Sequence, residues 1–451
     1  MEYFNNFYNN LITRANEEAV VDRGRVYTYQ ELINRVEFYD SFLEQNNISK
    51  NSLVSVFSNT GFDAISLFLS LCKNKITIVP VSYISKNKKH EFQQTATADY
   101  EISFIDGKPV LKNLESSGPK HEYYQTIFKR DSSGLVVFSS GSTGKNKAAI
   151  HDLNFIFEKF TKKRRKMRIV SFLLFDHLGG INTFLYTLSN GGCLIIPESR
   201  TAESVFKNIQ DHKANLLPTS PSFINMLLVS GKIHDYDLSS LKMVSYGTEL
   251  MHEHTLVAFR KALPDVELLQ TYGLTEIGVL RSKSLNSDSL WVKLGGSEFQ
   301  TRVVNNKLQI KGNSTMLGYL NHENPFTDDG WLITGDNVET NGEYYKILGR
   351  DSDIINVGGQ KVYPAEVENV ILKISNIADA SVYAEKNQFL GQIVCANVVL
   401  SSEEDKRNAT KRIKQECLQK LEKYKVPMKI KLVNKLQNSR FKRVRSSINE
   451  H

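Results

Sequence analysis

Apolar and polar positions follow two alternating periods along the first 275 residues of the chain. Short apolar runs, typical of buried strands, alternate with stretches in which apolar residues recur at helical spacing. Thr28 and Glu31 have the spacing of a helix capping box, and residues 61–71 have the composition of a buried helix. The pattern predicts a largely parallel, helix-covered sheet, with strands at 53–57, 76–80, 136–138, 171–175, 193–197, 214–218, 243–246 and 268–272.

The pattern changes near residue 290. Short strands and turns, such as 308–311 and 344–348, predict a small β-barrel subdomain over about 290–350. A helix near Pro364, two strands, a long basic helix and a last strand at 429–436 then predict a compact α+β unit. We therefore predict an α/β protein with a large N-terminal domain, 1–350, and a smaller C-terminal domain, 353–451.

Composition narrows the class of protein. No apolar run reaches the length of a membrane span, and the N-terminus lacks the basic and apolar regions of a signal peptide. The four cysteines, Cys72, Cys193, Cys395 and Cys417, form no C-x-x-C pair, which favours reduced thiols over a metal site or a disulfide framework. We expect a cytoplasmic enzyme.

The positive charge is concentrated in two places. Residues 401–451 hold 15 Lys and Arg against 6 Asp and Glu, a net charge of +9, whereas the whole chain carries +8. A second basic run extends from Lys159 to Arg168. Such runs attract nucleic acids, membranes or acidic partners, and the alternative for either is a solvated helix face. No RNA-binding motif or zinc-finger spacing accompanies them, so we expect no nucleic-acid partner.

A loop rich in serine and glycine follows the apolar run at 136–138 and reads SSGSTGKNK over 139–147. Glycines allow a close approach to an anion, hydroxyl groups donate to phosphate oxygens, and lysine supplies charge. The loop is not a Walker A sequence, because Ser139 stands where the first glycine belongs and Asn146 where the metal-binding Ser or Thr belongs. The composition predicts a phosphate-binding loop outside the P-loop NTPases.

Four further motifs follow in order: QTYGLTE at 270–276, ITGD at 333–336, GRDSD at 349–353 and VGGQKVYPAEVE at 357–368. Each alone has an ordinary structural interpretation as a turn or a helix start. Together with the loop, the chain resembles the adenylate-forming superfamily, which includes acyl- and aryl-CoA synthetases, peptide-synthetase adenylation domains and firefly luciferase. The resemblance covers nearly the whole chain and departs from the family's loop at Asn146 and Ala148.

The resemblance implies two half-reactions. A carboxylate attacks the α-phosphate of ATP and forms an acyl-adenylate, and a thiol then displaces AMP. The implied cofactors are ATP, Mg²⁺ and either CoA or the pantetheine arm of a carrier protein. The implied ATP and AMP ligands are Ser140, Gly141, Ser142, Thr143, Gly144, Lys147, Gly247, Thr248, Glu249, Thr271, Tyr272, Gly273, Asp336 and Arg350.

The resemblance also gives roles to individual residues. Thr275 is expected to donate to the α-phosphate, and Glu276 to bind Mg²⁺. Tyr272 is expected to stack on adenine, and Asp336 to accept the ribose hydroxyls beside Arg350.

The same resemblance extends to the C-terminal domain. Lys442 matches a lysine that bridges the substrate carboxylate and the phosphates, although Phe441 replaces the usual glycine. The C-terminal domain is expected to act as a mobile lid about a hinge at Ser352. Its rotation would bring Gly358 and Gly359 to a pantetheine tunnel.

For the acyl pocket, the resemblance points to His177, Tyr246 and Gly247. A tyrosine at 246, where the family has a small residue, predicts a short or polar acid. Asp176 could pair with an amine, which we rank lower. The acceptor is CoA, or an acidic acyl carrier protein attracted by the basic C-terminal domain. A stand-alone amino-acid adenylating enzyme and a silent nucleotide-binding homologue are the alternatives, and oligomeric state and pathway stay open.

Overall fold

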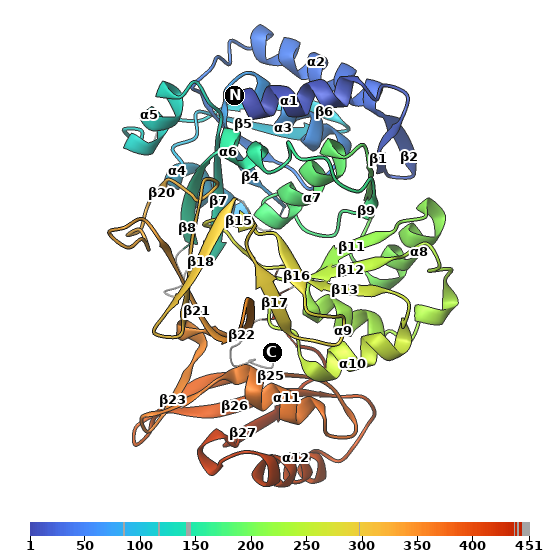
Figure 1. The fold of residues 1–451 in the computed structure, drawn as a ribbon, viewed down its shortest axis with the longest axis vertical. Coiled ribbons are helices and arrows are strands. Elements are labelled where there is room, and N and C mark those ends of the chain that lie inside the picture. The colour runs from blue at the N-terminus through green and yellow to red at the C-terminus, as the bar shows by residue number, and fades with distance from the viewer. Residues whose placement is uncertain are drawn as a thin grey trace.

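The computed structural model describes residues 1–83, 86–115, 118–140, 146–296, 298–436, 438–439 and 442–443. For residues 86, 87, 140, 438, 439, 442 and 443 it describes the backbone only. Figure 1 shows a large α/β part, a β-rich part in front of it and a small α+β domain below.

Two seven-stranded sheets form the large domain. The first has the order β20 (Gly318–Tyr319), β8 (Asn146–Asp152), β7 (Gly134–Ser140), β4 (Thr77–Val81), β3 (Leu53–Phe57), β5 (Tyr100–Ile105) and β6 (Lys108–Asn113). The second has the order β13 (Glu267–Gln270), β12 (Met243–Tyr246), β11 (Leu216–Thr219), β9 (Arg168–Val170), β10 (Cys193–Ile196), β1 (Glu18–Asp22) and β2 (Arg25–Thr28). The strands from β7 to β5 in the first sheet and from β13 to β1 in the second run parallel, as the strand–helix rhythm predicts. β8 is antiparallel to both of its neighbours, β7 and β20.

Helices separate and cover these sheets. The core between the sheets includes side chains of α1 (Glu2–Ile12), α2 (Tyr29–Gln45), α3 (Phe62–Lys73) and α7 (Leu178–Ser189). Val54 and Val56 of β3 point into this core, whereas Leu53 points to a second core on the opposite face. The period of two therefore buries both faces of the strand, which explains its continuous apolar sequence. The remaining helices of the large domain are α4 (Lys86–Thr95), α5 (Glu122–Lys129), α6 (Leu153–Glu158), α8 (Ala202–His212), α9 (Pro221–Val229) and α10 (Glu253–Ala262).

The β-subdomain is a six-stranded antiparallel sheet. Its order is β16 (Ser282–Ser284), β17 (Trp291–Leu294), β22 (Tyr344–Arg350), β21 (Leu332–Asn341), β19 (Lys307–Gly312) and β18 (Phe299–Val304). A short hairpin, β14 (Gly273–Leu274) and β15 (Gly278–Val279), connects the second large sheet to it.

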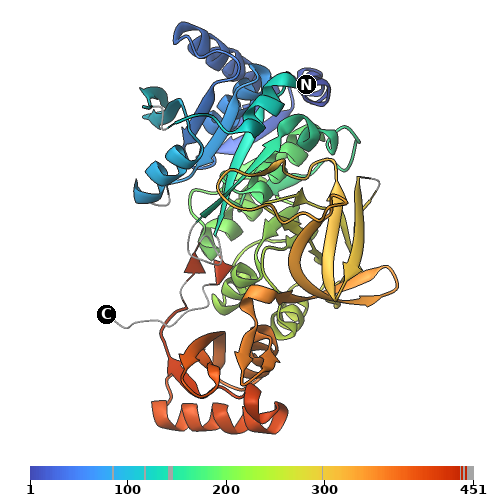
Figure 2. The same cartoon turned by 90° about the vertical axis from the view of Figure 1, so that its left-hand side faces the viewer.

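The C-terminal domain has a five-stranded sheet and two helices. Its elements are β23 (Ile355–Val357), β24 (Gln360–Val362), α11 (Pro364–Leu372), β25 (Ile377–Asn387), β26 (Gly391–Leu400), α12 (Lys406–Lys420) and β27 (Lys429–Leu432). The chain then forms a short hairpin, β28 (Asn438–Ser439) and β29 (Lys442–Arg443). Figure 2 shows this hairpin apart from the rest of the red domain, at the edge of the large domain.

Several local predictions are confirmed. Thr28 and Glu31 form the expected capping box: the Thr28 hydroxyl accepts from the Glu31 amide at 3.2 Å, and the Glu31 carboxylate accepts from the Thr28 amide at 2.8 Å. All four cysteines are free and buried. No helix within the described residues is both long enough and apolar enough to cross a membrane.

Three local predictions are wrong. The strand expected at 171–175 lies earlier in the chain, because β9 ends at Val170. The segment 171–175 is apolar because α7 packs on it: a Cβ on Gly180 would lie 2.0 Å from the Leu174 carbonyl oxygen. The strand expected at 429–436 ends at Leu432. The basic run from Lys159 is not a helix face, because α6 ends at Glu158 and no regular element follows before β9.

Candidate active site

The serine- and glycine-rich loop connects two antiparallel strands, β7 and β8, and Ser139 pairs with Lys147 across them. Gly141, Ser142, Thr143 and Gly144 lie outside the described residues, as does the side chain of Ser140. Lys147, at the end of the loop, places its ammonium group 5.2 Å from the centre of the Tyr319 ring. The described end of the loop, where β8 begins, thus lies beside β20, the strand that carries Tyr319.

Tyr319 also contacts Glu276. Its hydroxyl group donates a hydrogen bond to Glu276 Oε1, and the Glu276 backbone carbonyl accepts from the Met316 amide at 2.8 Å. Within the described part of the chain, Glu276 Oε2 accepts no hydrogen bond. One aromatic side chain therefore joins the end of the phosphate loop to the predicted metal ligand. Sequence reasoning missed Tyr319, because a lone Gly-Tyr pair carries no motif.

His151 on β8 supports the neighbouring residue. Its Nε2 lies 2.7 Å from the Thr275 carbonyl oxygen and its Nδ1 lies 3.3 Å from the Ser314 carbonyl oxygen. The imidazole is buried, and burial lowers the pKa of His151. A neutral ring has one N–H, so the shorter contact indicates Nε2–H donating to Thr275. His151 holds the backbone of the Thr275–Glu276 turn, and sequence analysis did not identify it.

Asp336 is the centre of a second group of polar side chains, which also includes Tyr272 and Arg350. It is 5% exposed, accepts a hydrogen bond from the Tyr272 hydroxyl group, and accepts from Arg350 Nε at 3.1 Å. β21 and β22 pair Asp336 directly with Arg350. Burial raises the pKa of Asp336, while the Arg350 charge opposes that rise, and the Glu276 charge acts on both residues. The structure thus brings the TYGLTE, TGD and GR motifs together.

The ends of β12 and β13 approach closely at Gly247. A Cβ on Gly247 would lie 2.6 Å from Thr271 Oγ1, and the Thr271 hydroxyl group donates to the Tyr246 carbonyl oxygen at 3.0 Å. Thr248 follows in a left-handed conformation with φ +71°. The Glu249 side chain accepts from the Ser222 amide at 3.0 Å and so caps α9, which leaves the backbone of 247–249 at the strand edge. Gly273 begins β14, and a Cβ added there would lie 2.6 Å from the Gly278 carbonyl oxygen of the partner strand β15.

The predicted acyl wall comes from two elements. His177 is the N-cap of α7, and its Nδ1 accepts from the Gly179 amide at 3.0 Å. Tyr246 ends β12 and is 1% exposed; its hydroxyl group makes no hydrogen bond with a described residue, and burial raises its pKa. Asp176 accepts from the Ser82 hydroxyl group at 2.8 Å and from its amide at 3.2 Å, which gives this carboxylate a structural role.

The C-terminal domain contacts the large domain through α11. His252 Nε2 lies 3.5 Å from the buried Glu368 carboxylate, and Lys373 pairs with Glu253 at 2.9 Å. Ser352 is exposed in a short 3₁₀ turn, Asp351–Asp353.

Gly358 and Gly359 connect β23 to β24 with φ +57° and +88°. Positive φ at both central positions is what a tight hairpin turn requires, so the turn is one reason for glycine at both positions. The structure describes the backbone of Lys442 in β29 and not its side chain.

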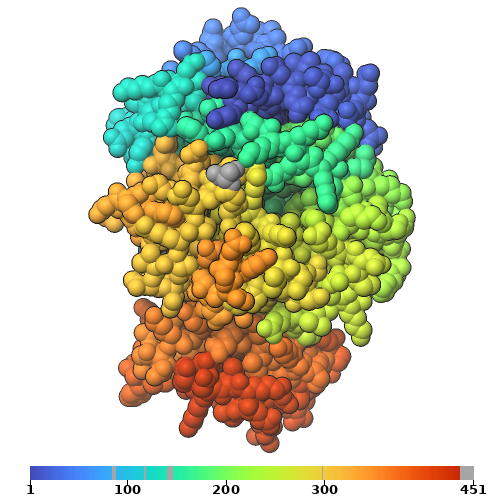
Figure 3. Space-filling view, in the orientation of Figure 1, coloured from blue at the N-terminus to red at the C-terminus, as the bar shows by residue number. Residues whose placement is uncertain are grey.

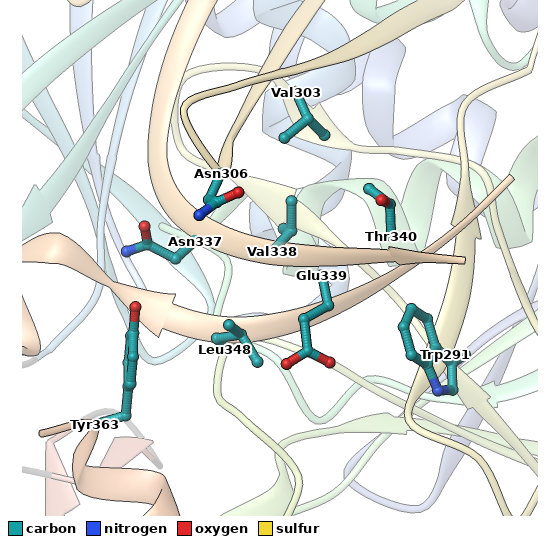
Figure 4. A pocket seen from close by; sticks show the side chains of 9 residues that line it. All are labelled: Trp291, Val303, Asn306, Asn337, Val338, Glu339, Thr340, Leu348 and Tyr363. Atoms are coloured by element: carbon teal, nitrogen blue, oxygen red, sulfur yellow. The ribbon is translucent and has the colours of Figure 1, made fainter. Parts of the chain in front are cut away.

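A pocket of about 500 Å³ lies between the β-subdomain and the start of α11. Figure 4 shows its side chains, with Tyr363 facing Asn337 and Leu348 across the cavity. Asn337 donates to the Asp351 carboxylate at 2.8 Å. This pocket borders the predicted hinge and contains none of the predicted phosphate or acyl ligands.

Comparison with known proteins identifies the family. The sequence profile of the AMP-binding enzyme family matches residues 8–320, and the profile of the AMP-binding enzyme C-terminal domain matches residues 366–442. The chain belongs to the AMP-binding enzyme family. The resemblance to adenylate-forming enzymes is thereby confirmed, together with the α/β fold of a large and a small domain.

Individual proteins that are similar to this chain in sequence or in fold are consistent with this family. A 2-succinylbenzoate–CoA ligase of Enterococcus faecalis is 24% identical over 435 residues, which cover 89% of this chain and 88% of that protein. The crystal structure of the anthranilate CoA ligase AuaEII with anthranoyl-AMP superposes with a TM-score of 0.82 at 18% identity, covering 98% of this chain and 95% of that chain. The amide bond synthetase McbA from Marinactinospora thermotolerans has the same fold, with a TM-score of 0.77 at 18% identity, covering 98% and 97%.

Proposed function

We propose that this member of the AMP-binding enzyme family is an ATP-dependent acid–thiol ligase that forms an acyl-adenylate and transfers the acyl group to CoA. The observation that carries the proposal is the convergence at Tyr319. The Lys147 ammonium group contacts the Tyr319 ring, and Glu276 accepts a hydrogen bond from the Tyr319 hydroxyl group. The end of the loop and the turn that carries Glu276 therefore contact the same side chain. Cationic and acidic groups side by side suit a triphosphate with its metal ion.

The residues fit a Mg²⁺–ATP complex. Glu276 Oε2 is unengaged among the described residues, and a single carboxylate together with phosphate oxygens is a usual ligand set for Mg²⁺. Mg²⁺ would neutralise the phosphate charge. A carboxylate offers about four lone-pair positions, and Tyr272 and Arg350 use two on Asp336. We assign the remaining two to the ribose hydroxyl groups.

The two half-reactions take place at the α-phosphorus of ATP and then at the acyl carbon. The acid's carboxylate oxygen attacks the α-phosphorus, the bond from phosphorus to the bridging oxygen breaks, and pyrophosphate leaves. We assign Lys442 to the bridging of carboxylate and phosphates, and Thr275 to the α-phosphate. Preorganised charge of this kind lowers a barrier by about 3 kcal/mol. The thiol of CoA then loses its proton to solvent and forms a carbon–sulfur bond with the acyl carbon, the bond from that carbon to the AMP oxygen breaks, and AMP leaves with the electron pair.

The lid movement belongs to the same proposal. Rotation about Ser352 would withdraw Lys442 and present the turn of Gly358 and Gly359 for the second half-reaction. The exposure of Ser352 supports this assignment, since a hinge residue needs room to change its dihedral angles. A carrier protein's pantetheine arm is the second candidate acceptor, favoured by the net charge of +9 over residues 401–451.

Carboxylate-dependent exchange of pyrophosphate into ATP tests the first half-reaction over a panel of acids. Addition of CoA or a carrier protein then tests the acceptor. Lys442→Ala is expected to abolish exchange while largely preserving thioester formation from a supplied acyl-adenylate. Lys435→Ala, in the same basic tail, is the matched control and should retain exchange. A protein that binds ATP but exchanges with no acid contradicts the proposal and favours a silent homologue.

A further inference from the structure

The segment after α6 encloses a cation that the mechanism does not use. Lys159 donates from Nζ to the side-chain oxygen of Asn182 on α7 and to the backbone carbonyl oxygen of Val279 in β15. Both partners are neutral oxygens, so neither compensates the ammonium charge. Burial and the nearby Arg164 lower the pKa of Lys159 to about 7.

Two arginines and one carboxylate surround this lysine. We define the basic cluster as Lys159, Arg164, Arg281 and Glu298, because the other three charges act directly on Lys159. Glu298 pairs with Arg281, and their side chains are 13% and 25% exposed. Three cations against one carboxylate leave a net charge of +2. Within the described residues, the buried Arg281 Nε and Glu298 Oε2 have no hydrogen-bond partner.

An excess of enclosed positive charge is unfavourable unless an anion joins it. The exposed Lys162 adds a further cation at the edge, since its Nζ lies 3.8 Å from Glu298 Oε1. The basic cluster therefore has more hydrogen-bond donors and more positive charge than the Glu298 carboxylate alone can pair with. A second carboxylate would balance this charge, because an arginine can donate hydrogen bonds to both oxygens of a carboxylate.

The cluster borders the proposed acyl site. Asn182 lies on α7, which begins beside His177, and Val279 follows Glu276 by three residues. Residues 275–277 form the turn between β14 and β15, so Val279 lies on the strand that leaves the Glu276 turn. Lys159 thus contacts α7, whose N-cap His177 is one of the two predicted wall residues, and the strand that follows the Glu276 turn. Figure 3 shows the surface hollowed between the blue-green segment after α6 and the yellow strands of the β-subdomain.

We propose that the basic cluster binds a second carboxylate on the acid substrate, so that this enzyme activates dicarboxylic acids. One carboxylate reacts with ATP, and the other lies on Lys159 and Arg281. This inference rests on the proposed function and names its substrate class. It also agrees with Tyr246, whose buried ring shortens the pocket against long apolar chains.

Pyrophosphate exchange on matched acids tests the subsite. Linear dicarboxylates of four to ten carbons are each compared with their monomethyl esters, which keep the reacting carboxylate and lose the second charge. We expect at least one dicarboxylate to exceed its ester about 10-fold or more in kcat/KM. Lys159→Met should remove that preference by raising KM for the diacid far more than for the ester. Lys163→Met, an exposed lysine of the same segment, should leave it unchanged.

The outcomes separate the two proposals. Preference for the esters, or an equal loss on both substrates in folded Lys159→Met, overturns the dicarboxylate subsite and leaves the ligase function intact. Absence of exchange with every acid contradicts the ligase function itself. If Lys159→Met does not fold, Arg164→Gln supplies the second variant, because this side chain is less enclosed. Its diacid preference should fall, and an unchanged preference counts against the subsite.

Discussion

His151 faces the Thr275 carbonyl oxygen through Nε2 at 2.7 Å, and this contact ties β8 to the proposed catalytic turn. β8 also forms one side of the phosphate loop. A displacement of His151 would therefore move both the phosphate loop and the Thr275–Glu276 turn. The imidazole is a positioning group, because it contacts the backbone of these residues and not the reacting atoms.

Replacement of His151 by leucine should remove that support. The Thr275 carbonyl oxygen would lose its buried donor, which costs about 1–3 kcal/mol in the free energy of unfolding. We expect kcat for pyrophosphate exchange to fall more than KM for ATP rises, because the turn is misplaced while most ATP contacts remain. His151→Gln restores an N–H donor and should recover much of kcat. Equal effects of the two variants on kcat would show that His151 acts only through core packing.

The same histidine predicts a pH dependence of stability. Burial holds the pKa of His151 below the ordinary value of 6.5. The unfolded chain therefore takes up a proton first as the pH falls, and the folded state loses stability from about pH 6.5 downwards until the folded pKa is reached. Urea unfolding at several pH values should show a shallower acid-side loss in His151→Gln than in the wild type. Parallel curves would contradict this assignment.

Much of the fold could be predicted from the sequence, because its strands are long enough to show a period. The capping box at Thr28 is local chemistry, and the structure has it. The segment at 171–175 misled the prediction, since apolar composition reports burial and not backbone pairing. Its phenylalanines, Phe172 and Phe175, enter two different cores although their segment has left the sheet.

The site was predictable only where a motif carries it. Glu276, Asp336 and Arg350 stand in recognisable patterns, and the fold brings them together. Tyr319 and His151 have no such pattern, because their contacts with Glu276 and Thr275 join residues that are 43 and 124 positions apart in the chain. The basic run from Lys159 was visible in the sequence, but its direction was not. The contacts of its ammonium group with Asn182 and Val279 show that Lys159 points inward.

Gly358 and Gly359 allow a test of the predicted pantetheine tunnel. If the positive φ angles of the turn are the only reason for glycine, Gly358→Asn should be nearly neutral, because asparagine tolerates this conformation. If the glycines line a tunnel, the added side chain should lower thioester formation at least several-fold and spare pyrophosphate exchange. We expect the second result. The measurement compares the two half-reactions in the same variant, with exchange as the internal control for folding.

Tyr246 should set the length of the acid. Tyr246→Ala removes a buried ring and leaves room behind the acyl wall, which costs about 3–5 kcal/mol of stability. In the variant that still folds, exchange should extend to longer acids, and kcat/KM for short acids should fall. Tyr246→Phe keeps the ring and removes the hydroxyl group, so it should keep the length limit. A palmitate preference in the wild type would contradict this assignment.

Lys159 should give the diacid reaction its own pH profile. In the free enzyme its pKa is about 7, so the ammonium charge is present below pH 7 and is lost above it. The kcat/KM for a dicarboxylate, which reports the free enzyme, should therefore fall as the pH rises through about 7, and that of the monomethyl ester should not. Lys159→Arg stays charged and should abolish this fall. A fall that persists in Lys159→Arg, or that the ester shares, assigns the titration elsewhere among the charged and titratable groups that face this site: Lys162, Arg164, Tyr186, Arg281 and Glu298.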